Sequence, residues 1–233
     1  MLARTLKLLS RTAVGLAFPS RCVHCGAGGS LLCGRCLSEA TRLSGPVCDR
    51  CALPLSHGSG CSACAESPPA FARMIAVYQF DGAVRDAVHA LKYDGLRAMA
   101  PVLGEVMAGH PALSRMRLEA VVPVPMHWQR TRARGYNHAE LLAREIGRRL
   151  SLPVLPRALK RVRNTPRQVE AADEQERARQ VASAFAPGAG AEGKRVLLID
   201  DVATTGSTLN ACARVLRRGG AQWVCAFVLA REV

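Results

Sequence analysis

The chain has 233 residues and a mass of 24.9 kDa, which is enough for one or two domains. A hydrophobic fraction of 49% excludes a disordered chain, and no stretch reaches the roughly 18 apolar residues that a membrane span needs. The formal net charge is +14, and residues 127–167 hold 11 basic residues but only two acidic ones. Such a window indicates an anionic ligand or partner, although a solvated basic face has the same composition.

The first 17 residues are basic and mildly amphipathic. Arg11 interrupts their apolar run, and no small-residue cleavage site of a secretory signal follows. We therefore expect a short helix that docks on the body of the protein, and a cytoplasmic location.

Eight of the ten cysteines form four C-x-x-C pairs between residues 22 and 64. A C-x-x-C turn directs two thiolates toward one point, and two such turns complete a tetrahedral zinc site. The simplest assignment is two structural sites, while an interleaved pairing stays open. The first site would use Cys22, Cys25, Cys33 and Cys36, and the second would use Cys48, Cys51, Cys61 and Cys64.

Disulfides and a redox dithiol are the alternatives to zinc. Disulfides would need an exported chain, and a redox dithiol would need one C-x-x-C beside a βαβ unit. Neither fits four tandem pairs without an export signal. The remaining cysteines, Cys212 and Cys225, lie in helix and strand patterns and are expected to be small buried hydrophobic residues.

After Pro68 and Pro69, strand and helix patterns alternate. In chain order we expect a strand at 73–80, a helix at 83–93, a helix near 101–109, a strand at 119–124, a helix at 138–150, a strand-like segment at 154–163, a helix-prone segment at 173–182, a strand at 195–199, a helix at 207–218 and a strand at 222–229. This alternation predicts an α/β fold with a mostly parallel sheet flanked by helices. Ligands of such folds bind at the carboxyl ends of the strands.

In two of the predicted helices, individual residues can be assigned to the apolar face or to the cap. Val84, Val88 and Leu91 share one face of the helix at 83–93. Asn137 can cap the next long helix, with Leu142, Ile146 and Leu150 facing inward.

The strongest site signal follows the strand at 195–199. The strand ends in Asp200 and Asp201, and the segment Ala203-Thr204-Thr205-Gly206-Ser207-Thr208 then opens a helix. A helix N-terminus and hydroxyl groups suit a phosphate, whereas adjacent carboxylates can accept hydrogen bonds from vicinal hydroxyls or hold Mg²⁺. A diol beside a phosphate describes a ribose 5-phosphate. The alternative is an ordinary strand-end turn or helix cap.

Other polar residues are less specific. Lys92 is either a ligand-facing cation or an exposed lysine at a helix end. His89, His110, His127 and His138 show no metal-ligand spacing, and we expect each to be on the surface or hydrogen-bonded.

The acid pair and its loop resemble the phosphoribosyl-pyrophosphate (PRPP) motif of type I phosphoribosyltransferases. The four C-x-x-C pairs narrow the resemblance to the ComF/GntX family of double-zinc-ribbon, phosphoribosyltransferase-like proteins. Further matching blocks are Leu91–Gly95, Val121–Pro125, Arg134–Asn137 and the run from Arg161 to Phe185. The resemblance covers residues 18–230 and implies a double zinc ribbon at 18–66 followed by a phosphoribosyltransferase-like domain at 70–233.

The resemblance also implies roles for individual residues. Asp200 and Asp201 would hold the ribose hydroxyls, directly or through Mg²⁺, and Ala203 to Thr208 would hold the 5′-phosphate. The loop Met126–Arg130 would meet the pyrophosphate, with Arg130, Arg132 and Arg134 as the nearest cations. Asp200, Asp201 and Arg130 are the implied catalytic residues. Tyr136, His138 and Gln180 depart from the family pattern, so the specificity for the acceptor could differ.

Three functions therefore compete. The first is Mg²⁺-dependent phosphoribosyl transfer from PRPP to an unidentified acceptor, or hydrolysis of PRPP. The second is a non-enzymatic module that binds PRPP or a nucleotide and contacts single-stranded DNA through the basic window, where Trp128 and Tyr136 could stack on bases. The third is a scaffold built on the zinc ribbons. The resemblance implies a role in natural competence and DNA uptake, with competence-machinery proteins as partners.

Overall fold

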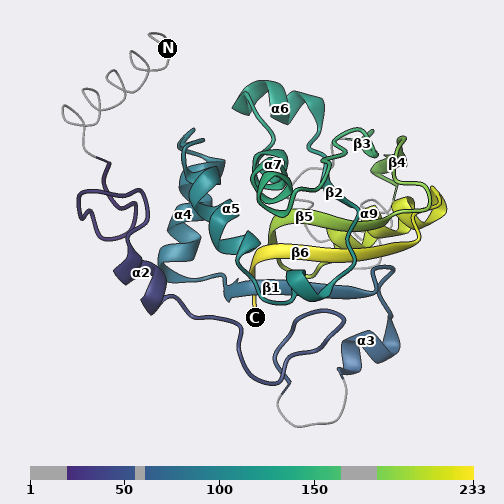
Figure 1. The fold of residues 1–233 in the computed structure, drawn as a ribbon, viewed down its shortest axis with the longest axis horizontal. Coiled ribbons are helices and arrows are strands. Elements are labelled where there is room, and N and C mark those ends of the chain that lie inside the picture. Colours follow the sequence, from purple (N-terminus) through teal and green to yellow (C-terminus); the bar gives the residue numbers. More distant parts are fainter. Residues whose placement is uncertain (1–19, 56–60, 164–182) are drawn as a thin grey trace, which may run out of the picture.

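The computed structural model describes residues 20–55, 61–163 and 183–233 (Figure 1). Its central sheet has four parallel strands in the order β1-β6-β5-β2. These strands are β1 (Arg73–Gln79), β2 (Ala120–Pro123), β5 (Arg195–Ala203) and β6 (Trp223–Arg231). The predicted α/β fold with a parallel sheet is confirmed.

Helices cover both faces of the sheet (Figure 1). One face packs against α4 (Gly82–Lys92), α5 (Met99–Ala108) and α7 (His138–Leu150), and the other packs against α9 (Ser207–Arg218). Successive residues of β5 alternate between the two cores, with Leu197 and Ile199 in the first and Val196 and Leu198 in the second. Both faces of the strand are therefore buried, as its apolar sequence predicts.

Most predicted elements form where they were expected. The helices α7 and α9 have the predicted bounds, and β1, α4, α5 and β2 lie within two residues of theirs. The Asn137 side chain accepts a hydrogen bond from the Ala139 N–H and caps α7 as predicted. The helix-prone segment at 173–182 and the helix expected within residues 1–17 lie outside the described residues.

Three elements differ from expectation. The strand β5 does not stop at Ile199, because β6 continues to pair with it as far as Ala203. The helix α6 (Trp128–Arg134) replaces an expected loop, because the His127 side chain accepts a hydrogen bond from the Gln129 N–H and caps it. The segment at 154–163 forms one isolated parallel bridge, between Val154 and Val121 of β2, and the short strand β3 (Leu159–Arg161), which pairs antiparallel with β4 (Phe185–Pro187).

The cysteine-rich segment lies along the β1 edge of the sheet. It contains the short helices α2 (Gly34–Glu39) and α3 (Ser62–Glu66). Outside this segment, a 3₁₀ turn, η1 (Leu113–Arg115), lies between α5 and β2. The N–H of Leu43 donates to the Val77 carbonyl at 3.1 Å, and the N–H of Gln79 donates to the Thr41 carbonyl at 2.8 Å. These bonds cover an edge strand that would otherwise be open to another chain.

In the part of the chain that the structure describes, no helix has the length and apolar character needed to cross a membrane.

Candidate functional site

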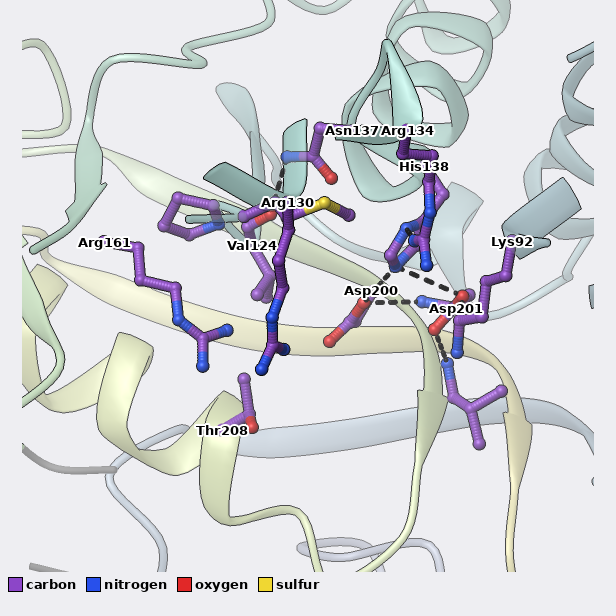
Figure 2. A pocket seen from close by; sticks show the side chains of 13 residues that line it. Lys92, Val124, Arg130, Arg134, Asn137, His138, Arg161, Asp200, Asp201 and Thr208 are labelled. Atoms are coloured by element: carbon purple, nitrogen blue, oxygen red, sulfur yellow. Dashed lines mark hydrogen bonds and ion pairs between the residues drawn. The ribbon is translucent and has the colours of Figure 1, made fainter. Parts of the chain in front are cut away.

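The main pocket lies at the carboxyl ends of β2 and β5. These strands are neighbours, but β2 leads to helices on one face and β5 leads to α9 on the other. Such a reversal opens a crevice at the sheet edge, and here it forms a cavity of about 390 Å³ (Figure 2). It is lined by Lys92, Val124, Pro125, Met126, Arg130, Arg134, Asn137, His138, Arg161, Asp200, Asp201, Val202 and Thr208.

The two carboxylates on the floor of the pocket are held in different ways. The Asp201 side chain is only 3% exposed, and its Oδ2 lies 2.9 Å from Lys92 Nζ and 3.3 Å from His138 Nε2. The Asp200 Oδ1 lies 3.8 Å from the same His138 nitrogen. The N–H of Asp201 also donates to Asp200 Oδ1 at 3.0 Å. Asp201 is therefore fixed by cationic and polar side chains, while Asp200 faces the cavity.

These surroundings shift the pKa values of the two carboxyl groups in opposite directions. Burial and the neighbouring charge of Asp201 raise the pKa of Asp200 to about 7. Burial also disfavours the charged form of Asp201, but His138 and Lys92 outweigh it and hold the pKa of Asp201 below its ordinary value. Near neutral pH, Asp201 is charged and Asp200 can exchange a proton.

The contacts of His138 define its hydrogen-bonding state. Its Nδ1 lies 2.9 Å from a guanidinium nitrogen of Arg134. A guanidinium can only donate, so Nδ1 accepts and the ring proton belongs on Nε2, which faces Asp201. Arg134, His138 and Asp201 thus form one connected chain of polar contacts.

The predicted phosphate loop runs from Ala203 to the first turn of α9. Ala203 is buried, and Gly206 adopts a φ of 78°, a conformation that favours glycine. The hydroxyl oxygens of Thr205 and Ser207 lie 2.7 Å apart. Thr208 alone of this loop lines the described cavity, and the residues on the adjoining turn are Ala203, Thr204, Thr205, Gly206 and Ser207.

Three arginines line the pocket in addition to Lys92. Arg130 and Arg134 come from α6, and Arg161 comes from β3. In Figure 2, the side chains of Arg130 and Arg161 extend side by side toward Thr208. Arg132 is exposed and lines a neighbouring hollow of about 630 Å³ instead. The pocket therefore combines arginine side chains, which can bind an anion, with two carboxylates, which can accept hydrogen bonds or hold a cation.

Three residues that line the pocket are not among the site residues predicted from the sequence, namely Lys92, His138 and Arg161. Of the two alternatives for Lys92, the exposed lysine at a helix end is wrong, because the side chain is 13% exposed, pairs with Asp201 and lines the pocket. The expectation that His138 is hydrogen-bonded is confirmed by its contact with Arg134, and this residue, which departs from the family pattern, also lies in the pocket. The predicted cap at Asn137 was the sequence signal that could have placed His138 in the site. Asn137 starts α7 beside the end of β2, where its Nδ2 donates to the Val124 carbonyl at 3.0 Å.

The cysteines form two clusters with the sequential pairing. The four sulfurs of each cluster lie within 4.8 Å of one another, and the interleaved pairing is not the one that the structure adopts. The sulfurs of Cys25 and Cys33 are 3.7 Å apart, and those of Cys51 and Cys61 are 3.5 Å apart. A tetrahedral site with Zn–S bonds of about 2.3 Å has sulfurs about 3.8 Å apart, whereas a disulfide bond is about 2.05 Å long. Both clusters fit zinc.

Backbone groups support the first cluster as a thiolate site. The N–H of Cys33 points to the Cys22 sulfur at 3.4 Å, and the N–H of Cys36 points to the Cys33 sulfur at 3.5 Å. Such contacts stabilise negative sulfur. His24 is not part of the cluster and instead contacts Asp86 of α4 at 2.8 Å.

Two family models match the chain. One describes a double zinc ribbon domain and matches residues 13–65. The other describes a phosphoribosyl transferase domain and matches residues 134–232. The first match contains the two cysteine clusters, and the second contains Asp200, Asp201 and Thr208 of the pocket.

Curated relatives match over most of their length. The Competence protein F of Haemophilus influenzae is 29% identical over 226 residues, which is 92% of this chain and 98% of the relative. The DNA utilization protein YhgH of Escherichia coli K12 is 29% identical over 208 residues, covering 87% and 91%. The Competence protein ComFC of Bacillus subtilis is 25% identical over 209 residues, covering 86% and 84%.

Similarity to solved structures is weaker. The glutamine PRPP amidotransferase of B. subtilis, complexed with ADP and GMP, aligns with 57% of this chain at 20% identity and a TM-score of 0.40. The alignment spans only 26% of that enzyme's chain, so it carries no argument about activity.

Proposed function

Because the chain belongs to the ComF family of double-zinc-ribbon, phosphoribosyltransferase-like proteins, we propose that its pocket binds PRPP, or a related ribose phosphate, together with Mg²⁺. We further propose that it transfers the phosphoribosyl group to an acceptor. The observation that carries this proposal is the arrangement of the pocket. An acid pair at the end of β5 and Thr208 of the hydroxyl-rich turn line the same pocket as Arg130, Arg134 and Arg161.

Each side of the pocket has a proposed role. Asp200 accepts hydrogen bonds from the ribose hydroxyls, and Asp201 orients the site through Lys92 and His138. The turn from Ala203 to Thr208 and the N-terminus of α9 bind the 5′-phosphate. Arg130 and Arg134 bind the pyrophosphate and stabilise the charge that develops as it leaves.

The residues present suit Mg²⁺. This ion usually binds to one or two carboxylates and completes its shell with water and substrate phosphates. Asp200 offers a carboxylate at the cavity, whereas Asp201 is already neutralised by Lys92. Mg²⁺ would therefore be held by Asp200 and the oxygens of the ligand, and when bound it would offset the charge of the leaving group.

The proposed reaction is a displacement at the anomeric carbon of the ribose. The bond from this carbon to a pyrophosphate oxygen breaks, the acceptor supplies the electron pair of the new bond, and pyrophosphate leaves. The protein's contribution is to hold the ribose by its hydroxyls and phosphate while the arginines bind the departing anion.

Calorimetric titration of the zinc-loaded protein with PRPP and Mg²⁺ tests binding. We expect micromolar affinity that is lost in the double variant Asp200→Asn/Asp201→Asn. The matched control is Glu105→Gln, which removes a surface carboxylate that pairs with Arg149 and should leave the affinity unchanged. A folded double variant that binds PRPP as the wild type does would contradict the assignment.

Release of pyrophosphate separates the enzyme from the binding module. A coupled pyrophosphate assay with candidate bases and amines as acceptors should show turnover that disappears in the double variant. PRPP binding with no turnover for any acceptor, and no hydrolysis, would favour the non-enzymatic alternative.

A second candidate function, binding of single-stranded DNA, is favoured by the outer face of α6. Trp128 is 62% exposed and borders the hollow that Arg132, Lys160 and Arg161 also line. An exposed aromatic ring among cations can stack on a base while the cations bind phosphates. The names of the relatives, which refer to competence and DNA utilization, agree with such a partner and with a role in DNA uptake alongside other competence proteins. Tyr136 is only 7% exposed, so the expectation that it offers a second stacking surface is wrong.

Substitutions in α6 test the DNA proposal. The variant Trp128→Ala should weaken the binding of a labelled single-stranded oligonucleotide about tenfold, because one stacked base contributes about 1–3 kcal/mol. The variant Arg132→Ala should also reduce the salt dependence of binding, whereas the exposed Arg115→Ala, outside the basic window, serves as a charge control. Unchanged affinity in Trp128→Ala and Arg132→Ala would refute this surface.

A further inference from the structure

A buried arginine joins the second cysteine cluster to the proposed phosphate loop. Arg231 is the last residue of β6 and is only 3% exposed. Its Nε donates to the Cys51 carbonyl at 3.2 Å, and one terminal nitrogen donates to the Ala203 carbonyl at 3.1 Å. Cys51 belongs to the second cluster, and Ala203 is the first residue of the loop. One planar side chain thus bridges two segments that are 152 positions apart in the sequence.

The loop side of this bridge is reinforced by the sheet. Ala203 and Arg231 are register partners at the ends of β5 and β6. The N–H of Glu232 donates to the same Ala203 carbonyl at 2.9 Å. The Ala203 carbonyl therefore receives two hydrogen bonds, both of which depend on the position of the β6 end.

The cysteine side of the bridge is also packed. Ala52 follows Cys51, is 3% exposed and has a φ of 58°, which is unusual for a residue other than glycine. It belongs to the same buried cluster as Met74, Ala203 and Leu209. The Met74 methyl group lies next to Gly206 of the loop, 3.3 Å from where a Cβ on this glycine would stand.

Charge gives the bridge a dependence on the metal. A buried guanidinium requires nearby compensating charge, and carbonyl partners supply only dipoles. A zinc-loaded cluster of four thiolates carries a net charge of about −2 and has a fixed shape. An empty cluster has neither property.

We infer that Arg231 is a positioning residue through which zinc at Cys48, Cys51, Cys61 and Cys64 fixes the Ala203–Thr208 loop for anion binding. The identity of the ligand, PRPP, rests on the proposed function. The coupling between the zinc cluster and the loop does not. Coupling between two sites is reciprocal, so PRPP at the loop must also strengthen zinc binding at the second cluster.

Zinc release is the first measurement. Transfer of zinc from the full-length protein to a chromophoric chelator should show that Mg²⁺ and PRPP slow the release of one of the two ions at least threefold. The variant Arg231→Gln should abolish this effect and weaken PRPP binding about tenfold. The conservative Arg231→Lys keeps the charge, but its single ammonium group does not match both carbonyls as the guanidinium does, and it should give an intermediate result.

A matched control is available beside the same cluster. Arg73 of β1 pairs with Asp49, next to the second cluster, but contacts nothing in the loop among the described residues. The variant Arg73→Gln should therefore retain both the PRPP affinity and the effect of PRPP on zinc release. Equal effects of Arg73→Gln and Arg231→Gln would reduce the role of Arg231 to general stabilisation of the ribbon and overturn the inference.

Hydrogen–deuterium exchange tests the coupling between the second cluster and the loop without any ligand. In zinc-loaded Arg231→Gln, peptides spanning residues 203–209 and the Glu232 amide should exchange at least threefold faster than in the wild type. The variant Cys61→Ser, which leaves the second cluster incomplete, should give the same increase in these peptides. Failure of the wild type to bind PRPP would refute the proposed function, and exchange would then decide the coupling by itself. Unchanged exchange in both variants would overturn the coupling.

Discussion

Asp200 and Asp201 are neighbours in sequence, yet their carboxylates meet different surroundings. Asp201 is nearly inaccessible and pairs with Lys92, whereas Asp200 faces the cavity and has a pKa raised to about 7. Successive residues of a strand point to opposite sides, so one adjacent pair can supply both a fixed charge and a titrating group. This division of roles was not evident from the two identical letters in the sequence.

The raised pKa of Asp200 has a consequence for stability. Because this carboxyl binds its proton more tightly in the folded state than in the unfolded state, the free energy of unfolding falls as pH rises from about 4 to about 7. Asparagine at this position does not titrate. We expect Asp200→Asn to gain about 2 kcal/mol relative to the wild type between pH 5.5 and pH 7.5. Urea unfolding at a series of pH values measures this difference, and a difference that stays constant over the range would contradict the assignment.

The ion pair of Lys92 can be tested by removing one partner. In Lys92→Met the Asp201 carboxylate stays buried without its cation, and breaking such a pair costs about 3 kcal/mol. We expect a loss of this size in the free energy of unfolding, measured with urea at pH 7.5. Lys160→Met is the control, because Lys160 is exposed. The idea fails if both variants are equally stable.

At the scale of elements, local signals predicted the helices well and the strand lengths less well. The helix α7 carries its own cap in Asn137, and α9 starts after Gly206, whose backbone conformation favours glycine. The end of β5 depends instead on pairing with β6, and the start of α6 depends on the His127 side chain. Such tertiary pairing and an uncommon cap leave no periodic pattern in the sequence.

The residues of the site likewise fall into two groups, those that sequence motifs predict and those that tertiary packing brings in. Asp200, Asp201, Thr208, Arg130 and Arg134 line the pocket and could be named from motifs. Lys92 and His138 come from other elements, and only the packing of α4 and α7 against the sheet brings them to Asp201. Sequence can indicate such residues but cannot show that their side chains turn inward.

Asn137 connects two elements of the site. Its side chain accepts from the Ala139 N–H at the start of α7 and donates to the Val124 carbonyl after β2. Asn137→Ala should lower the free energy of unfolding by about 1 kcal/mol through the lost cap, and more if the β2 end also shifts. Denaturant unfolding measures the loss. The adjacent Glu140→Gln on the outer side of α7 should change stability by less than about 0.5 kcal/mol.

At the scale of the whole molecule, the cysteine clusters are part of the main fold. Cys22 and Cys36 belong to the same buried core as Tyr78 and Val84, and His24 contacts Asp86 of α4. The second cluster is linked to the proposed phosphate loop through Arg231, which donates to the Cys51 and Ala203 carbonyls. Both clusters are therefore in contact with elements of the sheet domain.

Removal of zinc should consequently affect more than the ribbons. We expect a chelator to lower the melting temperature of the whole chain in a single transition, because the ribbon residues share the core with the sheet. Differential scanning calorimetry of the zinc-loaded and chelated protein measures this change. A sheet that melts at an unchanged temperature after zinc removal would show that the ribbons fold independently.

The two remaining cysteines provide an internal standard for such work. Cys212 and Cys225 are fully buried in the body, and burial raises the pKa of Cys225 to about 12, so neither sulfur reacts readily with an alkylating reagent while the fold persists. Of the eight cluster cysteines, Cys25 is exposed and three others are partly exposed, namely Cys33, Cys51 and Cys61. These thiols should react once metal is withdrawn, whereas Cys212 and Cys225 should react only when the sheet opens. A mass spectrum of the alkylated chain therefore distinguishes a protein that has lost its metal from one that has lost its fold.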